Sequence, residues 1–184
     1  TKNSVIIDGV PRKDMHFPVG LMDVIEIPEI NKAYRVLPSK KGNLLLSEIT
    51  KEEAKYKLCK IQNISTIPGG HLQLNLHDGR NILLKVDDPQ KRPELVYTTS
   101  GTLKISLPTQ EILNFFPLRE NSQAIIYQGR NMGAFGVISK ISKRYGVNAS
   151  LANIQTKSGE ISTSFHYLFV IGDKEPEIDL PMEE

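Results

Sequence analysis

The segment HLQLNLHDGRNILLKV, residues 71–86, alternates apolar and polar side chains, which limits this stretch to extended structure. Leu72, Leu74 and Leu76 would share one face, because successive side chains of a strand point to opposite faces of its sheet. The pair Asp78-Gly79 follows, and such a pair is typical of a tight hairpin turn. The sequence therefore predicts two half-buried antiparallel strands on either side of residue 78.

Short apolar runs divided by turn residues continue along most of the chain. Three more hairpin turns are predicted, at Asp8-Gly9, Lys41-Gly42 and Ser158-Gly159. Residues 102–107 alternate like residues 72–76. Residues 137–145 also align on one helical face, but their β-branched side chains and bounding glycines favour a strand. The sequence therefore predicts a mainly β chain.

One segment, TKEEAKYKLC at residues 50–59, differs from this pattern. Thr50 can cap a helix, Glu53 stands at the third position of a capping box, and Ala54 and Leu58 share a helical face. The sequence predicts one short helix here, held by packing because an isolated helix of this length is marginal.

Composition narrows the class of protein. A chain of 184 residues can form one domain or a few small modules, and a single cysteine, Cys59, cannot form an internal disulfide and fits a reducing compartment. Residues 173–184 carry a net charge of −5, which leaves +7 on the rest of a chain whose total is +2. A basic body suggests a polyanionic partner. No apolar run is long enough to span a membrane.

The segment GRNMGAFGVISKISKRYG, residues 129–146, raises the question of a phosphate-binding loop. Gly129, Gly133 and Gly136 match neither the P-loop nor the dinucleotide-binding spacing. They are interpreted as structural turn glycines, beside which backbone amides and Arg130 could approach a phosphate. Lys140, Lys143, Arg144 and Lys157 lie near this turn in sequence, next to Tyr145, and together favour an RNA-facing edge.

Three possible catalytic or metal sites have simpler explanations. His71 and His77 are about 20 Å apart along an extended strand, so they are assigned to a solvated polar face and no metal is expected. Cys59 is interpreted as a buried structural residue at the end of the predicted helix. Glu52 and Glu53 are adjacent and do not face each other on a helix. No enzymatic activity and no cofactor are predicted.

Six segments together carry a family resemblance. The segments PRKDMHFPVGLMDVIEI, EEAKYKLCKI, LNLHDGRNI, ISLPTQEI, GRNMGAFGVI and LFVIGDKEPEIDLP occur in the order seen in the archaeal and eukaryotic small-subunit ribosomal protein family S-four-e, and the fifth resembles a KOW motif. The resemblance implies three modules. These are the C-terminal part of an S-four-type RNA-binding domain (1–27), a central β domain with the short helix (28–118) and an SH3-like KOW barrel with an acidic tail (119–184). It further implies residues upstream of Thr1 that cover the first strands.

The same resemblance implies a structural role in translation. The chain would bind ribosomal RNA in the small subunit, in the cytoplasm, beside neighbouring ribosomal proteins, with no membrane and no small-molecule substrate. The basic residues expected to contact RNA are Arg12, Lys13, Arg80, Lys85, Arg130, Lys140, Lys143, Arg144 and Lys157. Gln128, Ala134 and Ser164 depart from the family pattern, as does the acidic ending. The alternative is a KOW-type module that binds protein in a transcription or translation complex.

Overall fold

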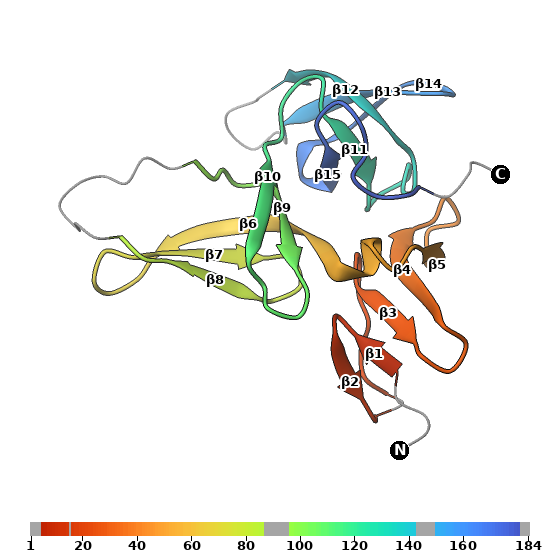
Figure 1. Ribbon diagram of the computed structural model, residues 1–184. Coiled ribbons are helices and arrows are strands. Elements are labelled where there is room, and N and C mark those ends of the chain that lie inside the picture. Colours follow the sequence, from red (N-terminus) through yellow and green to blue (C-terminus); the bar gives the residue numbers. More distant parts are fainter. Residues whose placement is uncertain (1–4, 15, 87–95, 143–149, 181–184) are drawn as a thin grey trace.

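The computed structural model describes residues 5–14, 16–86, 96–142 and 150–180. Within them the chain is almost entirely β, with fifteen strands and two short 3₁₀ turns. The strands form three five-stranded sheets that follow one another along the chain (Figure 1). Within the described residues, no helix is long and apolar enough to cross a membrane.

The first sheet has the strand order β2-β1-β3-β4-β5 and is antiparallel throughout. Its strands are β1 (Val5–Ile7), β2 (Val10–Arg12), β3 (Val24–Ile27), β4 (Lys32–Pro38) and β5 (Leu44–Ile49). Asp8 and Gly9 both have positive φ, which a tight hairpin turn requires at its two central residues. The domain boundary predicted after residue 27 falls inside this sheet, since β3 pairs directly with β4.

The second sheet has the strand order β10-β9-β6-β7-β8 and is built around one long strand. Its strands are β6 (Tyr56–Thr66), β7 (Leu72–Leu76), β8 (Asn81–Leu84), β9 (Thr102–Ser106) and β10 (Ile112–Phe116). Leu72, Leu74 and Leu76 are buried, while the residues between them are half-exposed, as the alternation predicted. The outer half of β6 projects with β7 and β8 away from the other sheets (Figure 1).

The short helix predicted for residues 50–59 is wrong. Thr50 does accept a hydrogen bond from the Glu53 N–H (3.2 Å), but only a 3₁₀ turn, η1 (Glu53–Lys55), follows. From Tyr56 onward the chain is strand β6, which pairs with β9 on one side and β7 on the other. Pairing of residues 56–60 with β9 and burial of the strand outweigh a local preference for helix that is weak in so short a segment.

The third sheet has the strand order β14-β13-β12-β11-β15. Its strands are β11 (Gln123–Ile126), β12 (Phe135–Ser142), β13 (Leu151–Thr156), β14 (Gly159–Ser164) and β15 (Leu168–Gly172), with the 3₁₀ turn η2 (Phe165–Tyr167) before β15. β12 covers the described part of the strand predicted for residues 137–145. The second predicted domain boundary, after residue 118, falls between the second and third sheets.

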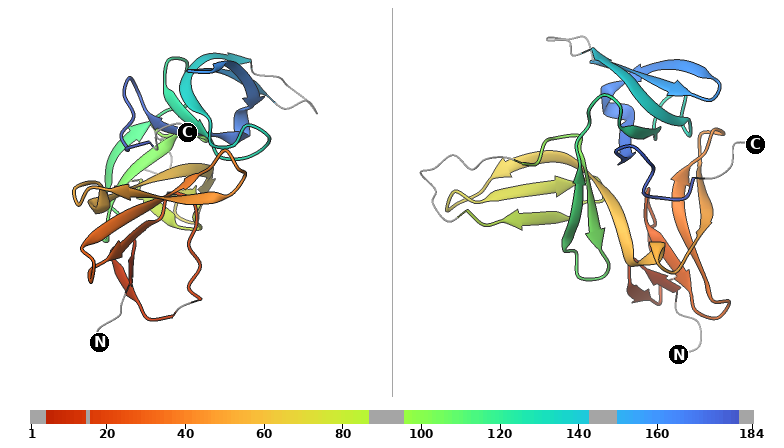
Figure 2. Two further views of the ribbon diagram at one scale, coloured as in Figure 1. Left: turned by 90° about the vertical axis from the view of Figure 1, so that its right-hand side faces the viewer. Right: turned by 45° about the horizontal axis from the view of Figure 1, so that its top comes forward.

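The three sheets meet in one shared core (Figure 2). Its buried members include Leu37 of the first sheet, Leu58 of the second and Phe169 of the third. Ile178, from the segment after β15, is buried in the same cluster. Smaller clusters lie within each sheet. The sheets are therefore joined through side chains rather than only through the linkers between them.

Candidate nucleic-acid interface

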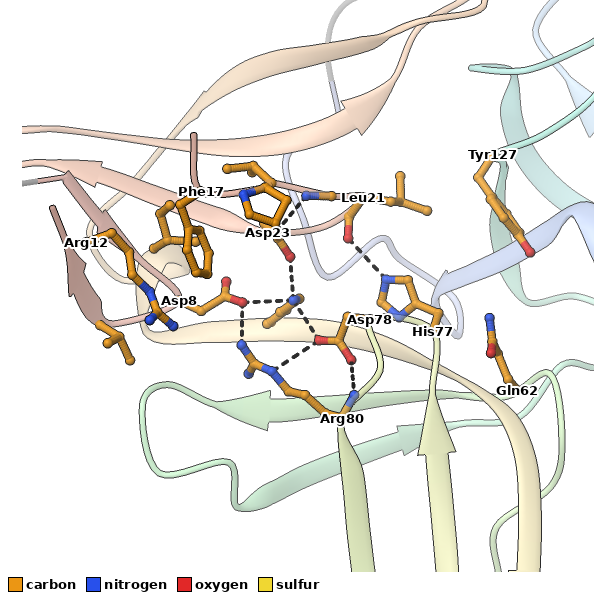
Figure 3. A pocket seen from close by; sticks show the side chains of 16 residues that line it. Asp8, Arg12, Phe17, Leu21, Asp23, Gln62, His77, Asp78, Arg80 and Tyr127 are labelled. Carbon is orange, nitrogen blue, oxygen red and sulfur yellow. Dashed lines mark hydrogen bonds and ion pairs between the residues drawn. The ribbon is translucent and has the colours of Figure 1, made fainter. Parts of the chain in front are cut away.

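A buried ammonium group lies where the first and second sheets meet (Figure 3). The Lys57 side chain is 1% exposed, and its Nζ lies 2.9 Å from Asp8, 2.6 Å from Asp23 and 2.8 Å from Asp78. Asp8 and Asp23 come from the first sheet, whereas Asp78 belongs to the β7–β8 turn. The three protons of one ammonium group thus bridge two sheets.

Arg80 completes this ion cluster, which we define as Lys57, Arg80, Asp8, Asp23 and Asp78. Its guanidinium lies 2.5 Å from Asp8 and 3.3 Å from Asp78. Every carboxylate oxygen of the cluster accepts at least one hydrogen bond, because backbone N–H groups supply the remaining donors. The ion cluster therefore holds the first and second sheets together. Two N–H groups of the Arg80 guanidinium are used within it.

Burial and charge act in opposite directions inside the ion cluster. Burial alone would lower the pKa of Lys57, but the acidic groups around it hold that pKa above its ordinary value. Burial alone would raise the pKa of Asp78, and the neighbouring Lys57 ammonium lowers it. Both groups are therefore charged at neutral pH, as an ion pair requires.

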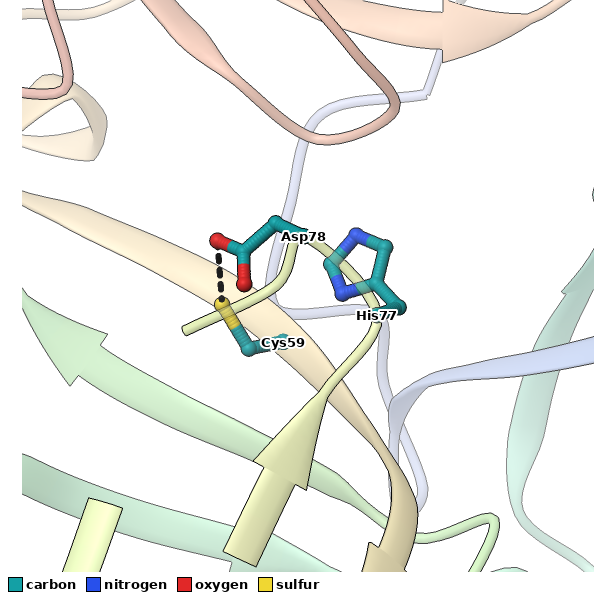
Figure 4. A group of neighbouring side chains, drawn as sticks. All are labelled: Cys59, His77 and Asp78. Carbon is teal, nitrogen blue, oxygen red and sulfur yellow. Dashed lines mark hydrogen bonds between the residues drawn. The ribbon is translucent and has the colours of Figure 1, made fainter. Parts of the chain in front are cut away.

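Cys59 and His77 converge on Asp78 of the ion cluster, with one candidate ligand atom of each residue within 4.8 Å of the others (Figure 4). The convergence is not a free metal site. Burial raises the pKa of the Cys59 thiol, and the His77 ring accepts from the Lys60 N–H (3.2 Å) and bonds the Leu21 carbonyl (3.1 Å). The prediction that His77 lies on a solvated face is wrong, because the β7–β8 turn folds it against Phe169.

Lys60, also on β6, joins the second sheet to the third. Its Nζ donates to the carbonyls of His166 (2.7 Å) and Leu168 (2.8 Å) and lies 4.9 Å from the centre of the Tyr127 ring. Burial lowers the pKa of Lys60 to about 8. Neither Lys57 nor Lys60 could be recognised from the sequence. Residues 57–61 are all buried, so this part of the strand shows no alternation of apolar and polar residues that would mark its two lysines.

At the tip of the first sheet the predicted RNA-binding residues Arg12 and Lys13 differ in environment. Lys13 is exposed, whereas Arg12 is partly buried with its guanidinium 4.1 Å above the centre of the Phe17 ring. Lys85 lies just beyond β8, at the far end of the second sheet, and is exposed. These positions are well apart in the fold (Figure 1).

The predicted glycine turn lies between β11 and β12. Gly129 and Gly133 have φ values of 87° and 84°, which favour glycine. Gly136 is different, since it lies within β12 and not in a turn. A Cβ atom there would come within 2.1 Å of the Gln155 carbonyl oxygen on β13, so that close approach, not turn geometry, requires glycine.

Arg130 and the turn that contains Lys157 lie at the same end of the third sheet. A cavity of about 230 Å³ is lined by Arg130, by Thr156 and Ser158 on either side of Lys157, and by Lys40 of the first sheet. Lys140 is exposed further along β12, opposite Asn153. Lys143 and Arg144 lie outside the described residues.

Five of the predicted basic residues are exposed to solvent. They are Lys13, Lys85, Arg130, Lys140 and Lys157. Among the described residues none of the five forms an ion pair, in contrast to Lys32 with Glu48 and Lys55 with Glu52. These five side chains are distributed over all three sheets and do not converge on one point.

Comparison with known proteins shows which family the chain belongs to. The model of Ribosomal family S4e matches residues 30–112. The chain is 51% identical to small ribosomal subunit protein eS4 of Staphylothermus marinus, over 95% of this chain and 70% of that protein. It is 46% identical to eS4 of Methanocaldococcus jannaschii, over 96% of this chain and 71% of the relative.

A solved structure shows the same fold. The crystal structure of the 30S ribosomal protein S4e from Thermoplasma acidophilum superposes with a TM-score of 0.75 and 32% sequence identity, covering 92% of this chain and 80% of that one. The chain belongs to the S4e family of ribosomal proteins.

Proposed function

We propose that this chain is a structural component of the small ribosomal subunit that binds ribosomal RNA in the cytoplasm, beside neighbouring ribosomal proteins, without catalysing a reaction. The observation that carries the proposal is the 51% identity to small ribosomal subunit protein eS4 over 95% of the chain. The S4e fold supports it. The exposed, unpaired basic side chains supply the chemistry, since cations that neutralise phosphates release counterions.

The phosphate contacts are assigned to five exposed residues. They are Lys13, Lys85, Arg130, Lys140 and Lys157, and Lys143 and Arg144, which lie outside the described residues, are proposed with them. Arg80 contributes less than the sequence suggested, because it is only 25% exposed and already bonds Asp8 and Asp78. Phosphate contacts of this kind fix the position of a protein on folded RNA without reading its sequence.

Binding of the purified chain to small-subunit ribosomal RNA over a range of salt concentrations tests this assignment. Replacing Arg130 and Lys157 with Gln removes two unpaired cations. The slope of log affinity against log salt should become shallower by about 1.4 to 1.8 if both contact phosphates. The matched control replaces Lys32 and Lys55 with Gln, an equal change of net charge at lysines that already pair with Glu48 and Glu52.

Equal slopes for the two double variants would contradict the assignment of these contacts. Absence of salt-dependent binding by the unaltered chain would contradict the proposed function itself. Purification of a tagged chain with the small subunit, rather than with a transcription complex, separates the ribosomal role from the protein-binding alternative.

A further inference from the structure

A second cavity, of about 620 Å³, opens between the first and second sheets above the ion cluster (Figure 3). This volume lies in the range of about 300–1,000 Å³ that is usual for small-ligand sites. One wall is apolar and comes from Val10, Phe17, Pro18 and Val19. The cavity is shaped for a ligand with an apolar face. Arg130 and Lys157, which the salt-dependence experiment replaces, do not line it.

The Arg12 guanidinium lies over the Phe17 ring at one end of this cavity, and we call this pair the Arg12–Phe17 platform. The guanidinium carbon lies 4.1 Å from the ring centre, and the Arg12 Nε is buried without a hydrogen-bond partner among the described residues. Stacking on the ring, not a carboxylate, therefore holds this guanidinium in place. Arg80 shows the contrast, since Asp8 and Asp78 hold its guanidinium.

The charges that line the cavity cancel. Three carboxylates face three cations, namely Lys57, Arg80 and Arg12. All the carboxylate oxygens already accept hydrogen bonds from the cluster's cations or from backbone N–H groups, so the floor does not require a cation. Since no net positive charge remains either, the floor does not attract a phosphate. A neutral ligand suits it best.

We propose that this cavity takes up one unstacked base of the ribosomal RNA, stacked on the Arg12–Phe17 platform. Proteins that recognise single-stranded RNA stack its splayed bases on aromatic rings and on arginine planes. A base is flat, neutral and apolar on its faces, as the platform and the charge balance require. Lys13, exposed and next in the chain, is placed for the phosphate outside the cavity. The proposal rests on the proposed function, because it names how the same RNA is held.

Two conservative substitutions separate base stacking from phosphate contact. Phe17→Leu removes the ring, and Arg12→Lys keeps the charge but removes the planar group. Each should weaken binding to small-subunit ribosomal RNA by about 5- to 150-fold, as for loss of one stacked base. The salt slope should stay unchanged, because no charge is lost. The control is Arg119→Lys, at an exposed arginine that pairs with Asp173 on the third sheet.

Unchanged affinity in both variants, with salt-dependent binding intact, overturns the proposal while the proposed function stands. Full affinity of Arg12→Lys combined with a shallower slope for Arg12→Gln also overturns it, since Arg12 is then a phosphate contact. Intact binding to RNA with loss of incorporation into subunits overturns it in favour of a protein segment in the cavity.

A second measurement does not depend on the variants being folded. Titration of the unaltered chain with the four nucleoside monophosphates, followed by NMR, should shift backbone signals of β2 and residues 16–21. Nucleoside monophosphates and inorganic phosphate should differ, because the latter has no base to stack. Shifts that are the same for both, or that fall only on the third sheet, contradict a base in this cavity.

Discussion

At the scale of single residues, the lysines on β6 decide how the sheets are joined. Lys57 is 1% exposed and faces three carboxylates, whereas Lys55, two positions earlier, pairs with Glu52 in solvent. Two lysines only two positions apart should therefore contribute very differently to the free energy of unfolding. Removal of one partner from a buried ion cluster leaves charges without solvent or counterion, while loss of an exposed pair costs little.

Lys57→Met should accordingly reduce the free energy of unfolding by about 3–5 kcal/mol, because three aspartates then face one another with only Arg80 beside them. Lys55→Met, the matched control, should change it by less than about 1 kcal/mol. Denaturant unfolding of both variants at neutral pH measures the difference. Equal stabilities would show that the ion cluster does not hold the first two sheets together.

Gly136 gives a second residue-scale prediction. Gly136→Ala should destabilise the chain by about 2–4 kcal/mol, because its Cβ would require β12 and β13 to separate near Gln155. Gly20→Ala is the control, since its Cβ would find no atom closer than 3.9 Å. Thermal unfolding should show a larger loss of stability for Gly136→Ala than for Gly20→Ala, and RNA binding of Gly136→Ala should fall only with its folded fraction. The reverse order would contradict the close approach.

At the scale of elements, period-two alternation was a sound guide and local helix signals were not. Strands β7, β9 and β12 and the hairpin turns at Asp8-Gly9 and Asp78-Gly79 could be predicted, because alternation and turn chemistry are local properties. The helix at residues 50–59 was wrong since pairing with β9 is a long-range property. The ion cluster could not be found, because Asp8 and Asp78 also have ordinary explanations as turn residues.

The lowered pKa of Lys60, which joins the second and third sheets, should make the free energy of unfolding depend on pH. Its folded-state pKa of about 8 lies below the ordinary value of 10.5. Between these two values the unfolded chain keeps a proton that the folded chain releases, so the free energy of unfolding rises with pH across that window. The neutral amine still has two N–H groups for the carbonyls of His166 and Leu168.

Comparison with Lys60→Met isolates this effect. The stability of the unaltered chain, relative to the variant, should increase by about 2–3 kcal/mol from below pH 8 to above pH 10. Denaturant unfolding at several pH values gives both curves. Parallel curves would mean that Lys60 titrates alike in the folded and unfolded states.

At the scale of the whole molecule, the shared core makes the three sheets interdependent. Phe169 of the third sheet is fully buried among residues of all three sheets, such as Leu37 and Leu58, and touches His77 edge-on. Leu74, in contrast, lies in a cluster confined to the second sheet. A substitution that creates a cavity at the junction should destabilise all three sheets. A substitution that creates one inside the second sheet should destabilise mainly that sheet.

Hydrogen exchange under native conditions tests this interdependence. Phe169→Ala should reduce protection of slowly exchanging amides in β4, β6 and β11 together, by an amount that corresponds to about 3–5 kcal/mol. Leu74→Ala should reduce protection chiefly in the second sheet. Confinement of the Phe169→Ala effect to β11–β15 would show that the sheets unfold as separate units.

The segment after β15 also closes the junction. Ile178 is buried in the shared core, Glu177 pairs with Lys104 at 2.5 Å, and its carbonyl accepts from the Tyr56 hydroxyl. The Asp179 N–H donates to Glu53. During synthesis the residues that make these contacts emerge last among the described residues. The apolar faces of the first two sheets therefore stay open until residue 178 has left the exit tunnel, and during that time the nascent chain is exposed to proteases and chaperones.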